Sequence, residues 1–398
     1  MRLTIVFLLA AYVLSQFYRV FLAVLTPVLG QALGMTPEQL ALALGLWFAA
    51  FAAMQIPVGN ALDRHGPRRT TALLLGLGGA GGAAAFALAQ GPGGVYLAMA
   101  LLGFGCSPVL MAGYYVVAHA FRPQMFSILA AALLGGGSLG NILGAAPMAA
   151  AVEAWGWRAA MWGLMAVTVV IAVGLWIFAR DPERAPVPAG PKGKGRLVDV
   201  LRNPAFLLIL PIAFTGQAAS SGIRGAWAGL WADQVHGADS LTIGHITLAM
   251  SLAMVVGTFA YGPADRVLGS HKRVVLWGNI CLCIALACLV AAPAMSVLWG
   301  AVALSAVGAF GSSYPVILAH GRGYFAPHMI GRGMTVLNLM SIGGVAAAQF
   351  GSAPLFRAVS AGGDPVFAYR MLFLFFLLPV VVSLVFYLFS ADKPAAES

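Results

Sequence analysis

Charged residues are scarce in this sequence. Only 9% of its 398 residues are Asp, Glu, Lys or Arg, whereas 61% are hydrophobic and the mean hydropathy is +0.91. An ordinary soluble domain contains about 25% charged residues. Because a water-soluble fold could not bury this much apolar surface, the composition excludes a soluble globular protein and predicts a membrane protein.

Cysteine is rare too, and all four cysteines lie in apolar runs, where a thiol behaves as a small hydrophobic group: Cys106, Cys281, Cys283 and Cys288. The sequence also lacks a glycine-rich phosphate loop and a large soluble domain. We therefore expect no disulfide, no metal and no cofactor, and a protein that is not an enzyme.

Long apolar runs are what the sequence has in abundance. A transmembrane helix needs about 20 mostly apolar residues, and the runs predict an all-α integral membrane protein. The twelve predicted membrane-spanning segments, called spans below, are 4–28, 38–61, 70–89, 94–118, 124–150, 158–180, 205–232, 241–262, 273–292, 295–319, 332–356 and 367–390.

A stretch rich in proline, glycine and charge separates six spans from the other six. The predicted organisation is an N-terminal six-helix bundle over 1–180, a linker over 181–204, a C-terminal six-helix bundle over 205–390 and a tail over 391–398. The linker composition suits an exposed segment that buries nothing.

Lysine and arginine gather in alternate loops. With an even number of spans both termini share a side, and the loops on that side hold 17 of the 22 Lys and Arg residues. The positive-inside rule then predicts cytoplasmic termini, in a bacterial cell inner membrane. Because the net charge of +10 lies in these short loops, we expect a lipid bilayer and no nucleic acid as partner. We expect a monomer.

The two halves of the sequence repeat each other. The motif FGCSP that begins at Phe104 recurs as FGSSYP from Phe310, and FRPQM at 121–125 recurs as FAPHM at 325–329. The segment GNALDR that ends at Arg64 recurs as YGPADR. These pairs are 202 to 207 residues apart, an offset too constant for chance apolar similarity. Repeated halves are how transporters build a central site between two bodies.

The loop GNALDRHGPRR between the second and third spans resembles the signature loop of the major facilitator superfamily, whose pattern is G-x-L-A-D-R-x-G-R-[RK]. The matching residues are Gly59, Asp63, Arg64, Gly66 and Arg68. Three positions depart from the pattern, and the second copy keeps Gly262, Asp265 and Arg266. The resemblance covers essentially the whole chain and implies two pseudo-symmetric six-helix bundles that move a small solute by alternating access.

In that superfamily the signature loop latches the cytoplasmic side in the outward-facing state. The resemblance therefore implies gating roles for Gly59, Asp63, Arg64, Gly66, Arg68, Asp265 and Arg266. A glycine at the end of a helix also lets a neighbouring helix approach closely. The alternative is that the loop arginines only set the topology.

Two arginines lie well inside spans, Arg19 in the first and Arg224 in the seventh, 205 residues apart and thus at matching places in the repeat. No Asp or Glu lies deep in a span, and Asp233 is the nearest. Guanidinium groups suit carboxylate or phosphate oxygens, so we predict that a small organic or inorganic anion binds between the two. The alternative is that they reach an interface, bond to backbone carbonyls and water, or pair with Asp233 or Glu38.

Further polar and aromatic residues could line the same cavity, although a Tyr or Trp in a span more often packs or lies at an interface. The predicted lining residues are Tyr18, Tyr114, Tyr115, Gln217, Trp227 and Asn338. A separate pattern, GGGSLGNILG, predicts close helix contact through Gly136, Gly140 and Gly144.

Three other functions remain open from the sequence. Efflux of an apolar or cationic drug-like compound would favour an acidic cavity. Copper transport could use Met250 and Met254 with His245 nearby, since thioethers suit Cu(I), although methionines at this spacing usually pack. A membrane-embedded sensor or enzyme is the third.

The coupling of transport to an ion gradient is also left open. The missing deep carboxylate argues against a carboxylate proton carrier, which leaves exchange, facilitated diffusion, a proton carried on the substrate or a titrating histidine.

Overall fold

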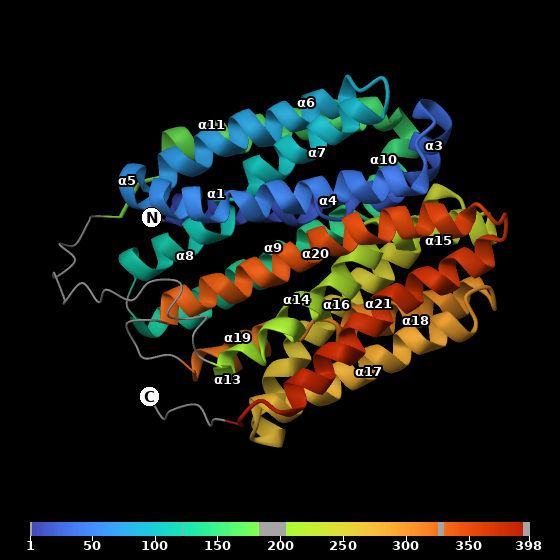
Figure 1. Ribbon diagram of the computed structural model, residues 1–398. Helices are drawn as coiled ribbons and strands as arrows, with labels where there is room; N and C mark the ends of the chain where they lie inside the picture. The colour runs from blue at the N-terminus through green and yellow to red at the C-terminus, as the bar shows by residue number, and fades with distance from the viewer. Residues whose placement is uncertain (1, 122, 183–203, 325–329, 393–398) are drawn as a thin grey trace. The chain divides into compact units, whose positions relative to one another are not determined.

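The computed structural model describes residues 2–121, 123–182, 204–324 and 330–392 (Figure 1). Every regular element in these ranges is a helix. Their contacts divide the chain into two compact units: Met1–Pro188 with Asp239–Leu248 form unit 1, and Ala189–Ala238 with Ala249–Ser398 form unit 2. The bundle boundaries expected from the sequence stay a prediction; most of the predicted linker, 183–203, and residues 393–398 of the predicted tail lie outside the described residues.

Unit 1 is built from the helices of the first six predicted spans. In chain order these are α1 (Arg2–Phe17), α2 (Phe21–Val24), α3 (Thr26–Leu33), α4 (Pro37–Ala53), α5 (Gln55–Leu74), η1 (Leu75–Ala80), α6 (Gly81–Ala87), α7 (Pro92–Cys106), α8 (Val109–Ala120), α9 (Pro123–Leu143), α10 (Ala146–Trp155) and α11 (Trp157–Phe178). Within the unit, α1 packs against α9 and α11, and α4 packs against α7.

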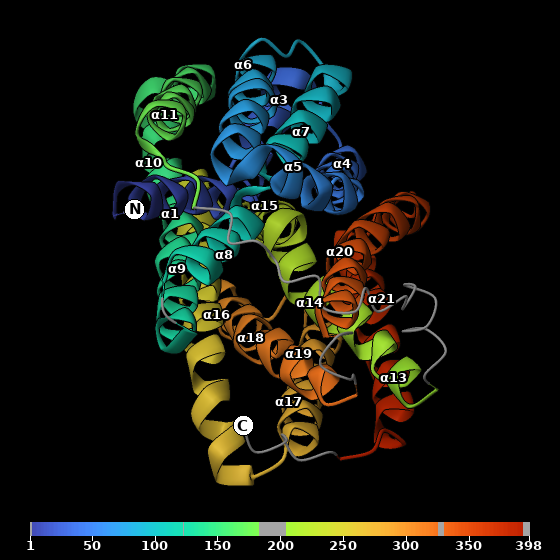
Figure 2. The ribbon, with the colours of Figure 1, turned by 90° about the vertical axis from the view of Figure 1, so that its left-hand side faces the viewer.

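Unit 2 contains the helices of the last six predicted spans, apart from the start of α16. They are α13 (Pro204–Leu207), α14 (Leu210–Gly222), η2 (Ile223–Trp227), α15 (Ala228–His236), α16 (Ser240–Leu268), α17 (His271–Ala291), α18 (Val297–Phe310), α19 (Tyr314–Arg322), α20 (Ile330–Ser360) and α21 (Pro365–Leu388). Here α14, α20 and α21 pack against one another (Figure 2), and α17 packs against α18 and α21.

Within the described residues, nine helical stretches are long and apolar enough to cross a membrane by length and composition alone. The first predicted span is missing from these nine because a turn at 18–20 interrupts it. The second is divided at Met54, and its remainder continues into the third as the stretch Gln55–Ala87, which bends at Gly66. The fifth predicted span, also missing from the nine, corresponds to α9 and the start of α10. The twelve predicted spans are thus present as helical segments, several of them with internal breaks.

Short polar residues mark the helix starts in the loops. The Ser296 hydroxyl accepts a hydrogen bond from the backbone nitrogen of Trp299 at 3.0 Å, before α18. Before α16, the Asp239 carboxylate accepts one from the backbone nitrogen of Thr242 at 2.8 Å, and the hydrogen bonds from Thr242 lower the pKa of Asp239. Such caps satisfy backbone N–H groups that a helix start leaves without an intrahelical partner.

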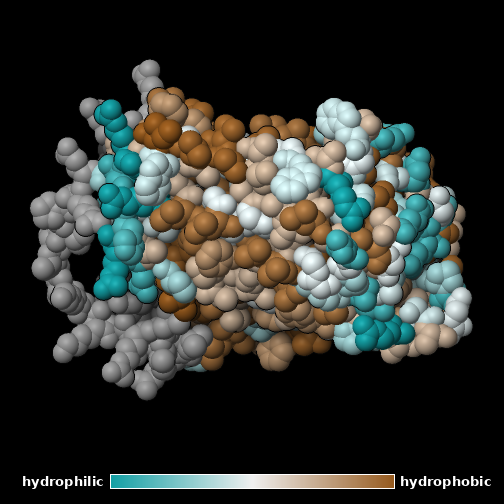
Figure 3. Space-filling model, turned by 90° about the horizontal axis from the view of Figure 1, so that it is seen from above, coloured by the Kyte–Doolittle hydropathy of each residue, from teal (hydrophilic) through white to brown (hydrophobic). Residues whose placement is uncertain are grey.

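The outer surfaces of the helices are apolar. Large hydrophobic side chains are strongly exposed in both units, for example Leu77 at 72%, Val170 at 66% and Leu298 at 75%. On the visible face, hydrophobic residues cover the long sides of the helices and hydrophilic residues gather toward their ends (Figure 3). A band of this kind faces lipid hydrocarbon, which requires that the backbone polar groups be satisfied inside the helices.

Glycine brings the helices of each unit into close contact at repeat-related positions. A Cβ atom on Gly140 of α9 would lie 1.9 Å from the carbonyl oxygen of Val13 on α1, and a Cβ on Gly344 of α20 would lie 1.9 Å from that of Phe214 on α14. The predicted contact through Gly136, Gly140 and Gly144 is therefore confirmed for α9. Small residues give this approach in membranes, where lipid offers helices no hydrophobic drive to associate.

Replacing Gly140 with alanine tests this contact. Since the new methyl group would overlap the α1 backbone, Gly140→Ala should lower the free energy of unfolding by about 1–3 kcal/mol. Thermal unfolding of the detergent-solubilised protein measures the change. Gly163→Ala is the matched control, because a Cβ there meets no atom within 4 Å; equal melting temperatures of the two variants would contradict the prediction.

Candidate functional site

Arg19 of unit 1 stands where the first span is interrupted. Tyr18, Arg19 and Val20 form a turn between α1 and α2, and the Arg19 backbone nitrogen bonds to the carbonyl of Gln16 at 3.3 Å. The Arg19 side chain is half-buried. Its guanidinium carbon lies 5.1 Å from the ring centroid of Trp47 and 5.0 Å from that of Phe51, both on α4. Breaks inside spans are tolerated where the backbone is buried in protein or lines a cavity.

Arg224 of unit 2 also lies on irregular backbone. It belongs to the π-helical segment η2, and only 3% of its surface is exposed. Its Nη1 donates a hydrogen bond to the Ser251 hydroxyl of α16 at 3.4 Å. Single π-helical turns inside α-helices are frequent at functional sites. Each arginine thus lies where its own span is interrupted or widened. The two differ in how deeply they are buried and in the residues that they contact.

Two of the predicted lining residues of unit 2 are held by hydrogen bonds from other spans. The Ser341 hydroxyl donates to Gln217 Oε1 at 2.7 Å, and the Tyr314 hydroxyl donates to Asn338 Oδ1 at 2.9 Å. Trp227 is fully buried, with its Nε1 donating to the Ser352 hydroxyl at 3.1 Å.

The predicted aromatic residues of unit 1 lie in different places. Tyr18 is fully buried, and its hydroxyl is hydrogen-bonded to that of Thr168 at 3.0 Å. Tyr114 is half-buried on α8. Tyr115 stacks on His119, with ring centroids 4.2 Å apart, and lines the cavity beside the 64–69 loop described below. Roles in solute binding for these residues remain predictions.

Sequence reasoning missed part of a polar stripe on α20. Besides Asn338 it comprises Ser341, Gln349 and Ser352, and Gln349, fully buried, donates to the Gly222 carbonyl at 2.8 Å. The spacing of 3, 8 and 3 residues puts all four on one face of a helix. That periodicity was readable from the sequence. By contrast, Met250 and Met254 pack against Gly308, as methionines at helical spacing commonly do.

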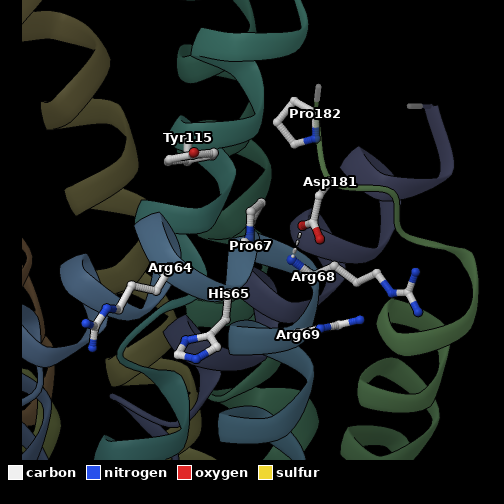
Figure 4. A pocket seen from close by; sticks show the side chains of 9 residues that line it. Arg64, His65, Pro67, Arg68, Arg69, Tyr115, Asp181 and Pro182 are labelled. Atoms are coloured by element: carbon white, nitrogen blue, oxygen red, sulfur yellow. Dashed lines mark hydrogen bonds between the residues drawn. The ribbon is translucent and has the colours of Figure 1, made fainter. Parts of the chain in front are cut away.

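A polar cavity of about 440 Å³ lies at one end of unit 1 (Figure 4). Its lining residues are Arg64, His65, Gly66, Pro67, Arg68, Arg69, Tyr115, Asp181 and Pro182. The guanidinium groups of Arg64 and Arg68 point away from each other, while the Asp181 carboxylate is directed at the loop backbone (Figure 4). Its Oδ1 accepts a hydrogen bond from the Arg68 backbone nitrogen at 2.8 Å.

Gly66 is the glycine on which this loop depends. Its φ of 83° is in the left-handed region, and a Cβ there would lie 2.7 Å from the Asp181 carboxylate. A Cβ on Gly59, by contrast, would meet nothing within 4 Å in the described part of the chain, so no close approach requires glycine there. Asp63 and Arg64 are exposed. The side chains of Asp265 and Arg266 lie outside the described residues.

Asp181 is a further residue that sequence reasoning missed, and unit 2 has a counterpart, Asp392. The Asp392 carboxylate accepts a hydrogen bond from the Ser270 hydroxyl at 2.6 Å, and that hydroxyl accepts from the Arg273 backbone nitrogen at 3.1 Å. The signal was a repeated F-x-x-D after the sixth and twelfth spans, at 178–181 and 389–392. In both units an aspartate therefore ties the end of the last span to the start of the third span of that half, at Arg68 of α5 and at Ser270 before α17.

Membrane-length helices in two repeated units, each with an arginine inside a span, define a multi-pass membrane transport protein. A profile of the Major Facilitator Superfamily matches residues 8–231, more than half of the sequence. The chain belongs to this superfamily. It is accordingly a transporter that moves a small solute across a membrane, with the twelve-helix fold of the superfamily, and it is not an enzyme.

Similar proteins agree with this assignment. The Bacillus subtilis (strain 168) protein described as uncharacterized transporter YybO is 22% identical over 267 residues. The match covers 63% of this chain and 61% of YybO, so the chain spans less than two thirds of that relative.

Solved structures resemble the whole chain. A crystal structure of a mutant of the nucleoside transporter NupG has a TM-score of 0.77 at 12% identity and covers 97% of this chain and 99% of its own. A bacterial homologue of the human lysosomal transporter Spinster, inward-facing and unoccupied, has a TM-score of 0.75 at 16% identity, covering 97% and 96%. At these identities the likeness shows the fold alone.

The Asp181 tie can be tested directly. Asp181→Ala removes the acceptor for the Arg68 amide and a negative charge at a helix start, so we expect a loss of about 0.5–2 kcal/mol in stability, as for other helix caps. Asp181→Asn keeps an oxygen acceptor and should cost less. Hydrogen exchange at the Arg68 amide, with thermal unfolding, would report both. Unchanged exchange in the alanine variant would show that the hydrogen bond contributes nothing.

Proposed function

We propose that the solute is a small organic or inorganic anion and that Arg19 and Arg224 bind it. The observation that supports this most strongly is that each half keeps one arginine inside a span, on an interrupted stretch of helix. A cation near the bilayer centre costs about 2.5–3.5 kcal/mol on insertion scales, so such residues usually face a cavity and serve function. This free-energy cost applies most clearly to Arg224, because only 3% of its surface is exposed.

Anion chemistry fits the residues around each arginine. Guanidinium donates two parallel hydrogen bonds to a carboxylate or phosphate, a geometry that ammonium lacks. In unit 2 the Ser251 hydroxyl lies beside the Arg224 guanidinium, and Gln217 and Asn338 carry further neutral hydrogen-bonding groups. A cationic drug would meet repulsion from both arginines, so efflux of such compounds is the less favoured function.

We further propose that the protein works by alternating access in a bacterial inner membrane, as a monomer with cytoplasmic termini. The excess of lysine and arginine in the loops on the terminal side supports this orientation. The loop from Gly59 to Arg68, with Asp265 and Arg266 in the second copy, would then control exchange between the two access states. Asp181 contributes by fixing the Arg68 end of the loop.

Thermal-shift measurements of the purified protein test the anion proposal. Acetate, citrate, phosphate, sulfate and methanesulfonate are compared with uridine and with the cation tetraphenylphosphonium. We expect saturable stabilisation by at least one anion. Losing one charge-assisted hydrogen bond costs about 1.5–3 kcal/mol, so Arg19→Gln and Arg224→Gln should each bind that anion about 10- to 100-fold more weakly.

The matched control is Arg357→Gln, which removes an exposed arginine at the end of α20. It should keep the wild-type shift. Uptake of the stabilising anion into proteoliposomes, with and without an imposed pH gradient, then identifies transport and its coupling. Wild-type shifts in both arginine variants would remove the anion site, and stabilisation by tetraphenylphosphonium alone would favour cation efflux.

The gating proposal predicts a kinetic defect. Asp63→Asn should slow uptake several-fold while the amount of protein in the membrane stays the same, because the carboxylate would no longer hold the loop in one access state. Glu153→Gln, another exposed carboxylate of unit 1, is the control and should transport normally. A wild-type uptake rate in Asp63→Asn would leave the loop arginines with topology as their only role.

A further inference from the structure

The two intramembrane arginines occupy matching places in the repeat, but different side chains surround them. Arg19 is in contact with two aromatic rings of α4. Arg224 is in contact with a serine hydroxyl of α16, the corresponding helix of the other half. Because the positions of the two arginines correspond, the difference in their contacts comes from the side chains that the neighbouring helix carries in each half.

The aromatic pair beside Arg19 is stacked and buried. Trp47 and Phe51 are one helical turn apart, and their rings stack with centroids 5.1 Å apart and planes inclined by 20°. Trp47 is fully buried and 4% of Phe51 is exposed. The α4 backbone is fixed as well, since a Cβ on Gly103 of α7 would lie 2.1 Å from the Trp47 carbonyl oxygen. The rings are therefore held by packing that does not involve Arg19.

The second half has methionines at the matching positions. The offset of 203 residues that relates Gly59 to Gly262 also relates Trp47 to Met250 and Phe51 to Met254. The packing supports this alignment, because Gly308 approaches the Met250 carbonyl as Gly103 approaches that of Trp47. The aromatic pair is thus specific to the N-terminal half and is no general requirement of the fold.

An aromatic face and a hydroxyl act differently on a guanidinium. The ring quadrupole attracts the cation and limits where it can lie, with tryptophan the strongest of the aromatic residues. Because a ring has no net charge, the contact stabilises the protonated arginine without cancelling its charge. A carboxylate neighbour would also stabilise the cation, but it would compete with an incoming anion.

We infer that Trp47 and Phe51 are positioning residues for Arg19: their stacked rings hold the guanidinium by cation–π contact and leave its positive charge to attract the transported anion. The part that concerns the anion rests on the proposed function. The contact itself does not, so the two can be tested apart.

The contact is tested without any ligand by the reaction of Arg19 with phenylglyoxal, in which the neutral guanidine adds to the carbonyl groups of the reagent. The full-length protein in detergent is modified over a time course, and adducts are quantified residue by residue by mass spectrometry. Trp47→Leu removes a ring that covers Arg19 and stabilises its cation, so we expect Arg19 to react at least about threefold faster. Trp47→Phe keeps a π face and should react within about twofold of wild type.

Phe48→Leu is the matched control. Phe48 is buried beside Trp47, in edge-to-face contact with it at 4.9 Å, so its loss also removes a packed ring. It should leave the Arg19 rate unchanged, and Arg158, which lies 4.1 Å from the ring of Trp157, serves as an internal reference in every variant. If Trp47→Leu does not fold, Phe51→Leu should still speed the Arg19 reaction.

Two results would overturn the inference: a wild-type Arg19 rate in both Trp47→Leu and Phe51→Leu, or an equal acceleration in Phe48→Leu. The role of Trp47 in anion binding is measured by the thermal-shift assay with the same five anions. Trp47→Leu should raise the half-saturating concentration of the stabilising anion about three- to tenfold, and Trp47→Phe should leave it unchanged. If none of these anions stabilises the wild type, the proposed function fails while the reactivity result still decides the contact.

Discussion

The hydrocarbon of the membrane offers no hydrogen bonds, and the structure follows from that constraint. Backbone groups must be satisfied inside helices, and every regular element in the part of the chain that the structure describes is a helix. Helices are interrupted or widened at several places, among them Met54, 75–80, 18–20 and 223–227, and each needs protein or water nearby to satisfy the backbone groups it releases. The last two of these places matter most here. These are also the places where the two intramembrane arginines are found.

Within each unit, close backbone contact holds the helices together. Lipid is as apolar as the helix surfaces, so there is no hydrophobic force to drive them together. Gly140 against α1 and Gly344 against α14 are repeat-related crossings of this kind. They hold the first span of each half against the fifth, at Val13 and Phe214, which precede the arginine of that half by six and ten residues. Tightly packed helix contacts of this kind can fix the position of a span. A charged side chain on that span is then held in place although its own backbone is irregular.

The two halves resemble each other in the contacts of their loops and differ in the residues that surround their arginines. Asp181 and Asp392 both tie the end of the last span to the start of the third span of their half, Asp181 directly to a backbone N–H and Asp392 through the Ser270 hydroxyl. Arg19 and Arg224, in contrast, have aromatic and hydroxyl neighbours respectively. The two halves thus share one framework, while the side chains around the two charges differ.

The sequence by itself determined the helices, the repeat, the signature loop and the two arginines, since apolar run length, a constant offset and isolated charges are local properties of the chain. It did not determine the break at Tyr18–Val20, the bend at Gly66 or the docking of Asp181, since each depends on a partner distant in sequence or on backbone geometry that apolar composition does not encode. The pairing of Trp47 with Arg19 was likewise decided by tertiary structure. Two helices must pack before a ring meets a cation, and packing is a property of the whole unit.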